Sequence, residues 1–339
     1  MCAIKGEITL KELSALANLS INTISRALNE RDGVSRETRE YVQSLAREHN
    51  YRPNMMARSM RGQQSTLIGT LVGDMTDNFF VELLSGVEEE TTKESMPIII
   101  GNTGEDIQKQ QATIDMLLSY GCRNFIITPV QGNTTFIETL SEKNANLVIA
   151  DRTIESADSV HQIGINNRKD SYRTVEYLIR CGHRRIAVVN QRSDIGTETD
   201  RTQGYLEALA DNGIERCAAY IVNCENRGDV PGAMHRLLTG PECPSAVFIA
   251  KDTLSLNAVS AIYDAGLRVP EDISVVLYGS PEWSQSFRPY FTCMARAVKD
   301  IGRTSARIII DQMKGNRCAG PINIKFDSNL VIRDSVRMI

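Results

Sequence analysis

The chain has 339 residues, with 38 Lys or Arg against 42 Asp or Glu and a formal net charge of −4. A hydrophobic content of 42% and a charged content of 24% are typical of a folded globular protein, which excludes a disordered or fibrous chain. Its length predicts about two or three domains. Every apolar run is shorter than the roughly 18 residues needed to cross a bilayer. The first ten residues also lack the apolar core of a secretory signal, so we expect a cytoplasmic protein without a membrane partner.

The eight cysteines and four histidines are scattered along the chain, and no two cysteines are spaced as Cys-x-x-Cys. This pattern is not typical of a zinc site or a disulfide framework. The sequence also has no phosphate-binding P-loop, no His-Glu-x-x-His and no Gly-x-Ser-x-Gly. We therefore expect no enzyme, no catalytic residues, no metal and no cofactor. An enzyme that uses Asp151 and Arg201 stays open, but no base–nucleophile pair can be assigned.

Charge is distributed unevenly along the chain. Residues 1–62 carry ten Lys or Arg against seven acids, a net +3, which leaves −7 for the rest. A basic segment joined to a larger acidic body favours a DNA-binding head attached to a sensing domain.

A capping box begins the first expected helix, because Thr9 and Glu12 in TLKE can each bond the other's backbone amide. The helix should end near Asn18, a residue type that tolerates the left-handed backbone of a sharp turn. Its apolar side consists of Leu10, Leu13, Leu16 and Ala17.

A second expected helix, INTISRALN, begins after Ser20 and follows the first so closely that the two form a helix-turn-helix. Its inward-facing residues are Ile24, Ala27 and Leu28. The second helix of this motif fits the DNA major groove, where Asn22 suits adenine and Ile21 suits a thymine methyl group. The residues expected to contact phosphates are Thr23, Ser25, Arg26 and Asn29.

A third expected helix starts at Ser35 and runs through ETREYVQSLAREH. The residues expected to close the small core of the head are Tyr41, Val42, Leu45 and Ala46. A three-helix module with a purely structural role is the alternative to DNA binding.

Together these segments resemble the head of the LacI-type transcription regulators, the lactose repressor family. The similarity continues through IGTLVGDMTDNFFVELLSGVEEE, GHRRIAVV, DRTQGYLEAL and AGLRVPEDISVV, so it covers nearly the whole chain. Asn18 and Asn50 stand where the family usually has glycine, at turn positions that Asn can occupy. The further residues to which the resemblance assigns DNA contacts are Thr9, Leu10, Ser20, Thr38, Tyr51, Asn54, Ala57, Arg58 and Met60.

The resemblance also implies the domain organisation. It predicts a lambda-repressor-like helical head over 1–52, a hinge helix over 53–62 and an α/β core over 63–339. The core should have two flavodoxin-like lobes with parallel sheets, similar to periplasmic sugar-binding proteins. The first lobe is expected over about 63–162 and 291–320, and the second over about 163–290 and 321–339.

The expected hinge has its own physical logic. Pro53 can begin a helix, but NMMARSMR is shorter than the about 12 residues that a helix needs to be stable alone in water. It should therefore fold when DNA and a second subunit supply contacts. In the resembling family this helix enters the minor groove, and Met60 falls at the position of the side chain that wedges a base step apart. A plain interdomain linker is the alternative.

From Thr66 onward, apolar runs alternate with helical stretches that end at Gly121, Gly182, Gly213 and Gly266. This alternation predicts parallel sheets covered by helices on both faces. The strand candidates are LIGTLV, MPIIIG, NFIITP, NLVIA, HQIGI, RRIAVV, AAYIV, SAVFIA and ISVVLY.

Ligands of such folds bind at the carboxyl ends of the strands, here between the lobes. Asp151 and Arg201 match a hydroxyl-accepting carboxylate and a ligand-clamping arginine of the resembling family. The alternatives are an ion pair of Asp151 with Arg152 or Lys251, and core packing for the two phenylalanines. The candidate effector-binding residues are Asp77, Phe79, Phe80, Asp151, Thr197, Arg201, Lys251 and Ser280.

Two departures from the family pattern concern charge. Lys251-Asp252 replaces the usual Asn-Asp, and residues 277–280, Leu-Tyr-Gly-Ser, replace Gly-Phe-Asp-Asp. The site is thereby shifted by +3, and buried charge without a counter-charge is unfavourable. We therefore expect an anionic effector, such as a sugar acid or a sugar phosphate. The alternatives are that Asp77 or Asp151 neutralises Lys251, or that the site has lost its ligand.

The sequence thus predicts a nucleoid-associated repressor of carbohydrate-metabolism genes that binds a pseudo-palindromic operator as a homodimer. A dimer is preferred because no heptad tail follows NLVIRDSV. The alternative is a sugar-binding protein of the periplasmic type without regulatory DNA binding.

Overall fold

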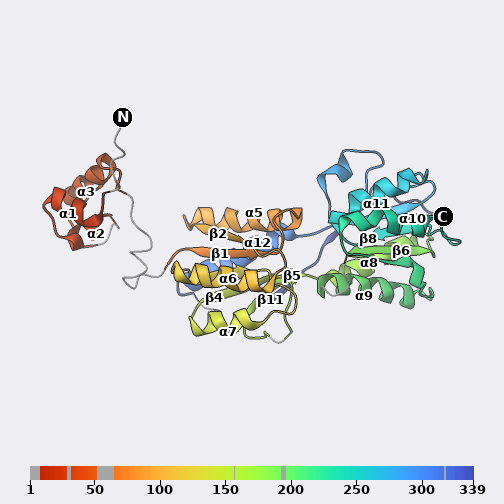
Figure 1. Cartoon of the computed structure of the whole chain (residues 1–339), viewed down its shortest axis with the longest axis horizontal. Coiled ribbons are helices and arrows are strands. Elements are labelled where there is room, and N and C mark those ends of the chain that lie inside the picture. Colours follow the sequence, from red (N-terminus) through yellow and green to blue (C-terminus); the bar gives the residue numbers. More distant parts are fainter. Residues whose placement is uncertain (1–7, 29–31, 52–64, 156, 192–195, 317) are drawn as a thin grey trace. The chain divides into compact units, whose positions relative to one another are not determined.

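The computed structural model describes residues 8–28, 32–51, 65–155, 157–191, 196–316 and 318–339, and the chain divides into two compact units, 1–65 and 66–339 (Figure 1). We call the first unit the head and the second the core. The expected hinge helix over 53–62 lies outside the described residues.

The head contains three helices, α1 (Leu10–Ala17), α2 (Ile21–Leu28) and α3 (Arg36–Glu48). The expected capping box is present, since the Thr9 hydroxyl accepts from the Glu12 amide and the Glu12 carboxylate accepts from the Thr9 amide at 2.7 Å. Asn18 ends α1 with a φ of 52°, as its residue type suggested. The Ser20 hydroxyl accepts from the Thr23 amide and begins α2.

The head core is built from one stripe of each helix. Its buried side chains are Leu13, Ala17, Ile24, Ala27, Val42 and Ala46. Two residues expected in this core are exposed instead, Leu16 at 51% and Tyr41 at 48%. Leu16 directly precedes Ala17 and Tyr41 directly precedes Val42, so each points about 100° around its helix from the buried neighbour.

The first lobe of the core is a six-stranded parallel sheet in the order β11-β5-β4-β3-β1-β2. Helices α5 and α12 pack on one face, and α6 and α7 on the other (Figure 1). Its strands are β1 (Ile68–Val72), β2 (Ile98–Asn102), β3 (Asn124–Ile127), β4 (Asn146–Asp151), β5 (His161–Ile165) and β11 (Asn323–Phe326). Its helices are α5 (Asn78–Lys93), α6 (Ile107–Ser119), α7 (Thr135–Glu142) and α12 (Val298–Met313).

The second lobe repeats this architecture in the order β12-β10-β9-β8-β6-β7, with α8 and α9 on one face and α10 and α11 on the other. Four of its strand pairings are parallel, and β12 runs antiparallel to β10 at the edge. Its strands are β6 (Ile186–Gln191), β7 (Ile221–Cys224), β8 (Ala246–Ile249), β9 (Ser274–Tyr278), β10 (Thr292–Ala295) and β12 (Asn329–Val331). Its helices are α8 (Asn167–Arg180), α9 (Gly196–Asp211), α10 (Val230–Thr239) and α11 (Asp252–Asp264), with short 3-10 turns at Ala218–Tyr220, Arg227–Asp229 and Glu282–Gln285.

The chain passes between the lobes after β5, after β10 and after β11. These points differ from the expected lobe boundaries. β5 stays in the first sheet beside β4, so the first crossing follows Ile165 rather than residue 162. β10 belongs to the second sheet, and β11 to the first. An apolar run marks a strand but carries no signal for the sheet that it joins.

Helices α5 and α12 cross at two glycines. A Cβ atom on Gly86 would lie 2.2 Å from the Lys299 carbonyl oxygen, and one on Gly302 would lie 2.0 Å from that of Leu83. The absence of side chains lets the two backbones touch. Since α5 begins beside the cavity described below, this crossing fixes one wall of the candidate site.

Candidate functional site

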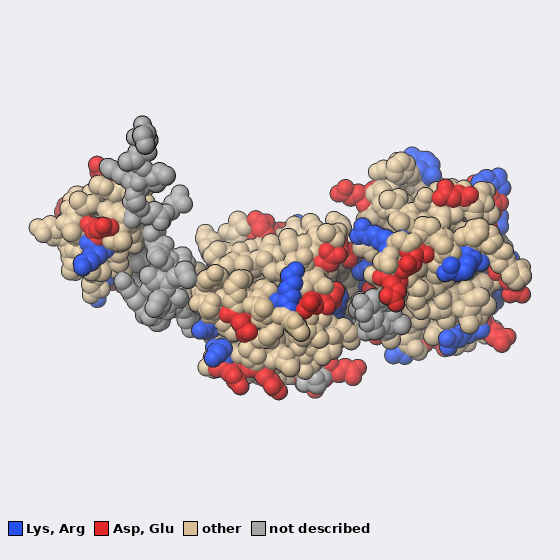
Figure 2. All heavy atoms as spheres, viewed as in Figure 1, with Lys and Arg blue, Asp and Glu red and all other residues tan. Residues whose placement is uncertain are grey.

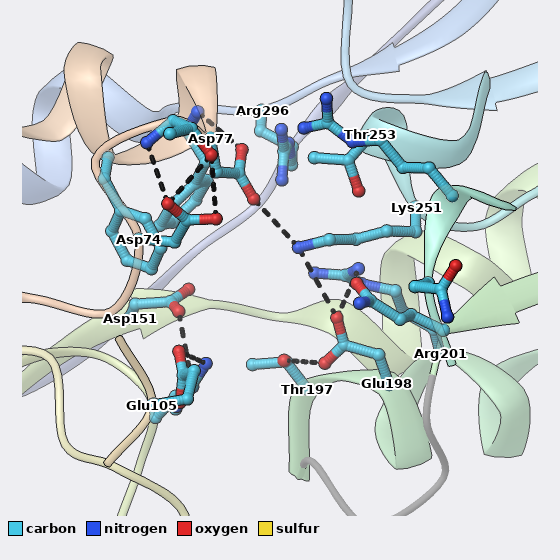
Figure 3. Close-up of a pocket in the computed structure, with 17 residues that line it drawn as sticks. Asp74, Asp77, Glu105, Asp151, Thr197, Glu198, Arg201, Lys251, Thr253 and Arg296 are labelled. Carbon is cyan, nitrogen blue, oxygen red and sulfur yellow. Dashed lines mark hydrogen bonds and ion pairs between the residues drawn. The ribbon is translucent and has the colours of Figure 1, made fainter. Parts of the chain in front are cut away.

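A cavity of about 280 Å³ opens between the lobes at the carboxyl ends of the strands (Figure 3). Seven of the eight expected effector-binding residues line it, brought together from four separate segments. They are Asp77, Phe79, Phe80, Asp151, Thr197, Arg201 and Lys251. The eighth, Ser280, instead lines a neighbouring cavity with Trp283 and Glu282. Phe79 and Phe80 meet edge to face and belong to the core of the first lobe, so the core packing considered as the alternative is confirmed, and contact with an effector stays a prediction.

Asp151 is the last residue of β4 and has a φ of 69°. The adjacent strand position must be glycine, because a Cβ atom on Gly164 would lie 2.7 Å from the Asp151 carbonyl oxygen. Burial raises the pKa of Asp151, while Arg152 and Arg201 act in the opposite direction. Its carboxylate lies 4.0 Å from Arg152 Nε, so the expected ion pair is long. Arg152 instead forms a two-pronged pair with Glu105, at 2.6 and 2.8 Å.

Lys251 directly precedes α11, and its side chain extends across the cavity to Asp77 (Figure 3). The distance from Lys251 Nζ is 3.0 Å to Asp77 Oδ2 and 3.7 Å to Glu198 Oε1. Burial alone would lower the pKa of Lys251, but the Asp77 and Glu198 carboxylates outweigh it and raise the pKa. This lysine is therefore charged and neutralised within the protein, which is one of the alternatives left open by the sequence.

Arg201 has only 4% of its side chain exposed and joins three parts of the second lobe. Its Nε donates to Asn167 Oδ1 and its Nη1 to the Ala250 carbonyl oxygen, both at 2.9 Å. The guanidinium also lies 4.4 Å from the centre of the Tyr278 ring. Arg201 thus lines the cavity but also serves the packing of the lobe.

Sequence reasoning missed several lining residues. Glu198 could have been found, since it lies three positions before Arg201 on the same helix and pairs with it at 3.4 Å. Arg296, on the second interlobe crossing, carries no such signal; it pairs with Asp252 and lies 4.9 Å from the centre of the Phe79 ring. The missed lining residues are Asp74, Thr76, Glu105, Arg152, Gln191, Glu198, Asn226, Arg227, Thr253 and Arg296.

The charges of the described lining residues balance. The acids are Asp74, Asp77, Glu105, Asp151 and Glu198, and the bases are Arg152, Arg201, Arg227, Lys251 and Arg296. Burial tends to raise the pKa of Glu198, but Arg201 and Lys251 lower it, so this carboxylate is an anion inside the site. The positive charge that led us to expect an anionic effector is therefore neutralised by carboxylates of the protein itself, including Glu198.

In the head, α2 presents Ile21, Asn22 and Arg26 on its exposed side. Thr23 and Ser25 are half-buried. The side chains of Thr9, Ser20 and Thr38 take part in helix caps, and Leu10 and Tyr51 pack against the head core. The expected DNA-contacting residues outside the described ranges are Asn29, Asn54, Ala57, Arg58 and Met60.

The described part of the head carries equal numbers of basic and acidic residues, five of each. Its sequence excess of +3 therefore comes from residues outside the described ranges, namely Lys5, Arg31, Arg52, Arg58 and Arg61 against Glu7 and Glu30. On the visible face of the core, acidic and basic side chains are interspersed (Figure 2).

No group of three or more His, Cys, Asp or Glu side chains in the described ranges could hold a metal ion. Within those ranges, no helix has both the length and the apolar character needed to span a membrane.

Comparison with known proteins identifies both units. The sequence profile of bacterial regulatory proteins of the lacI family matches residues 9–54, and that of the periplasmic binding protein-like domain matches residues 175–336. The chain is 30% identical over 338 residues to the HTH-type transcriptional repressor CytR of Escherichia coli (strain K12), covering 98% of this chain and 97% of that repressor.

Solved structures agree with this match. The complex of the transcriptional regulator CelR with cellobiose is 25% identical, with a TM-score of 0.73 over 97% of this chain and 100% of that chain. The lac repressor dimer bound to operator and the anti-inducer ONPF has a TM-score of 0.85 over 98% of this chain and 99% of that chain. At 23% identity, the latter likeness concerns the fold alone. The fold predicted from the sequence, a helix-turn-helix head and a two-lobed α/β core, is confirmed.

Proposed function

Because the chain belongs to the LacI family of bacterial regulatory proteins, we propose that it is a transcriptional repressor controlled by a sugar-derived effector. The observation that carries this proposal is the pairing, in one chain, of an exposed helix-turn-helix surface with a polar cavity between two lobes. The head reads the operator, and the cavity binds the effector. The relative CytR is named a transcriptional repressor, and the similar regulator CelR was solved with cellobiose.

The exposed start of α2 supports sequence reading by Ile21 and Asn22. An asparagine amide can bond both polar edge atoms of adenine, and an isoleucine side chain can contact a thymine methyl group. Arg26, also exposed, positions the helix through a phosphate. The hinge residues Asn54, Ala57, Arg58 and Met60 complete the interface in the minor groove.

The repressor acts as a homodimer. Its operator is pseudo-palindromic, because two-fold symmetry of the protein imposes two-fold symmetry on the DNA site. The structurally similar lac repressor was solved as a dimer on its operator. Such a protein works in the cytoplasm, on the nucleoid, and the genes that it controls serve carbohydrate metabolism.

Asp151 is the acceptor for effector hydroxyl groups. It is buried, its carboxylate has a long ion pair with Arg152 at 4.0 Å, and it lines the same cavity as the Phe79 and Phe80 rings. A buried carboxylate is stabilised by hydrogen bonds, which sugar hydroxyls supply. The balanced charges support a sugar-derived effector that does not need a negative charge. Calorimetric titration with a neutral hexose, its uronic acid and its 6-phosphate compares the affinities of neutral and anionic effectors. Tighter binding of the acid or the phosphate would contradict this proposal and support the anionic effector expected from the sequence.

Two variants of α2 test the DNA-binding half on operator fragments retained from the source genome. Replacing Asn22 by Ala should weaken discrimination at one operator position by about 1–3 kcal/mol, or about 5- to 150-fold. Replacing Arg26 by Ala should weaken binding to all sequences alike and reduce the salt slope by about 1. Unchanged operator affinity and unchanged discrimination in both variants would argue against reading by α2.

A further inference from the structure

Lys251 joins the two lobes of the core through one side chain. It stands at the start of α11 in the second lobe, and Asp77 stands at the start of α5 in the first. The 3.0 Å pair between them crosses the cavity, and Glu198 of α9 lies 3.7 Å from the same ammonium group. The side chains of Asp77 and Glu198 are 6% and 3% exposed, and that of Lys251 is 16% exposed, so water screens these contacts little.

We propose that Lys251 is an internal bridge that holds the lobes together across the effector cavity. The bridge is made of the chain's own groups, so it stabilises one arrangement of the lobes independently of any small molecule. The effector then acts on an equilibrium that the protein has already biased. The geometric part of this proposal stands on the core alone, and its consequence for operator binding rests on the function proposed above.

Both carboxylates are held in place for this role. Asp77 Oδ1 accepts from the Phe79 amide at 3.0 Å and caps α5, which leaves Oδ2 directed at Lys251 (Figure 3). Glu198 Oε2 accepts from the Thr197 hydroxyl, while Oε1 meets Lys251 and Arg201. Because neither carboxylate needs to be reoriented, the pair keeps more of its electrostatic attraction.

Two other ion pairs of the cavity each lie within one lobe, unlike the bridge. Glu105 and Arg152 both belong to the first lobe, and Glu198 and Arg201 both belong to α9. Separation of the lobes leaves those pairs intact but leaves Lys251 and Asp77 without each other. Lys251 then keeps Glu198 of its own lobe, but Asp77 loses its cation, and an uncompensated carboxylate opposes opening unless water or a ligand replaces the partner.

Pulsed electron–electron resonance between two spin labels measures the distance between the lobes, which the bridge should keep short. Labels are placed through an unnatural amino acid at Ala112 on α6 and His235 on α10, one exposed position in each lobe. The labelled full chain is mixed with an excess of unlabelled chain, so that each dimer carries one labelled protomer. We expect Lys251→Met to give a longer mean distance and a broader distribution than the native protein. A distribution that superimposes on the native one overturns the proposal.

A double-mutant cycle assigns the effect to the pair. Asp77→Asn keeps a helix-capping side chain but removes the charge, so it should lengthen the distance as Lys251→Met does, and the double variant should add nothing further. Additive shifts would mean that the residues act separately, which contradicts a bridge. Arg268→Met, which breaks an exposed pair with Asp272 within the second lobe, is the matched control and should keep the native distribution. Lys251→Gln replaces Lys251→Met if the latter fails to unfold cooperatively.

Operator binding without effector tests the regulatory consequence. We expect Lys251→Met and Asp77→Asn to change the operator Kd by a similar factor, at least threefold, with no larger change in the double variant. An unchanged Kd beside a changed interlobe distance would refute the coupling to DNA. Failure of the native protein to bind any operator would refute the proposed function, and the distance measurement would still decide the bridge.

Discussion

Replacement of Arg201 by Ala should destabilise the core as well as remove a cavity residue. The guanidinium is almost fully buried and bonds Asn167 Oδ1 and the Ala250 carbonyl oxygen, each at 2.9 Å. Truncation removes the donor to both acceptors and one of the two cations beside the Glu198 carboxylate, which keeps Lys251 at 3.7 Å. Removing one partner of a buried charged pair costs about 3–5 kcal/mol. For a core that spans residues 66–339, with an unfolding entropy of about 2.1 cal/mol/K per residue, that corresponds to a fall in Tm of about 5–9 °C.

Differential scanning calorimetry of the full chain measures this effect, with the transition of the core followed separately from that of the head. The matched control is Asp151→Asn, a substitution in the same cavity that leaves the Arg201 contacts in place. It should abolish effector binding without lowering the Tm. A Tm within 2 °C of the native value for Arg201→Ala would refute the structural role assigned to these hydrogen bonds.

Three further predictions follow from the core. Gly302→Ala would place a Cβ atom 2.0 Å from a carbonyl oxygen of α5, so we expect a loss of about 1–3 kcal/mol in calorimetry, whereas Gly320→Ala, with no atom within 4 Å, should be neutral. Asp151→Asn should leave stability at pH 7 unchanged or raise it, because burial raises the pKa of that carboxyl and so penalises its charged form in the fold. Hydrogen bonding from Arg303 lowers the pKa of Glu89 to about 2, so its stabilising contribution is present above pH 4.5 and is lost as the pH falls towards 2. The Tm difference between Glu89→Gln and the native protein should therefore be largest near neutral pH and vanish near pH 2, and a difference that persists there would contradict this assignment.

The sequence predicted local structure well where a backbone conformation strongly favours one residue type, such as glycine at positive φ. Gly121, Gly182, Gly213 and Gly266 all have positive φ at helix ends, as expected. Each of the nine expected strands overlaps an observed one. The short strands β10, β11 and β12 were missed, because their burial depends on partners distant in the sequence.

The sequence predicted which residues line the candidate site better than it predicted the balance of charge within it. Residues that follow strands, such as Asp77 and Asp151, could be selected because the fold brings strand ends together. The pairing of Lys251 with Asp77 could not be predicted with certainty, since 174 residues separate the two and only packing of the lobes decides the distance. Glu198, which the sequence analysis did not place in the cavity, shows how a single carboxylate changes the electrostatics of a buried site.

The most direct test of the central claim is to capture fragments of the source genome on the purified full-length protein and sequence those retained. A repressor of the proposed kind should enrich a pseudo-palindrome upstream of carbohydrate-metabolism genes, and Asn22→Ala should reduce that enrichment. If no sequence is enriched, with or without cell extract to supply a corepressor, the protein is not a sequence-specific regulator and its function lies in the ligand-binding core.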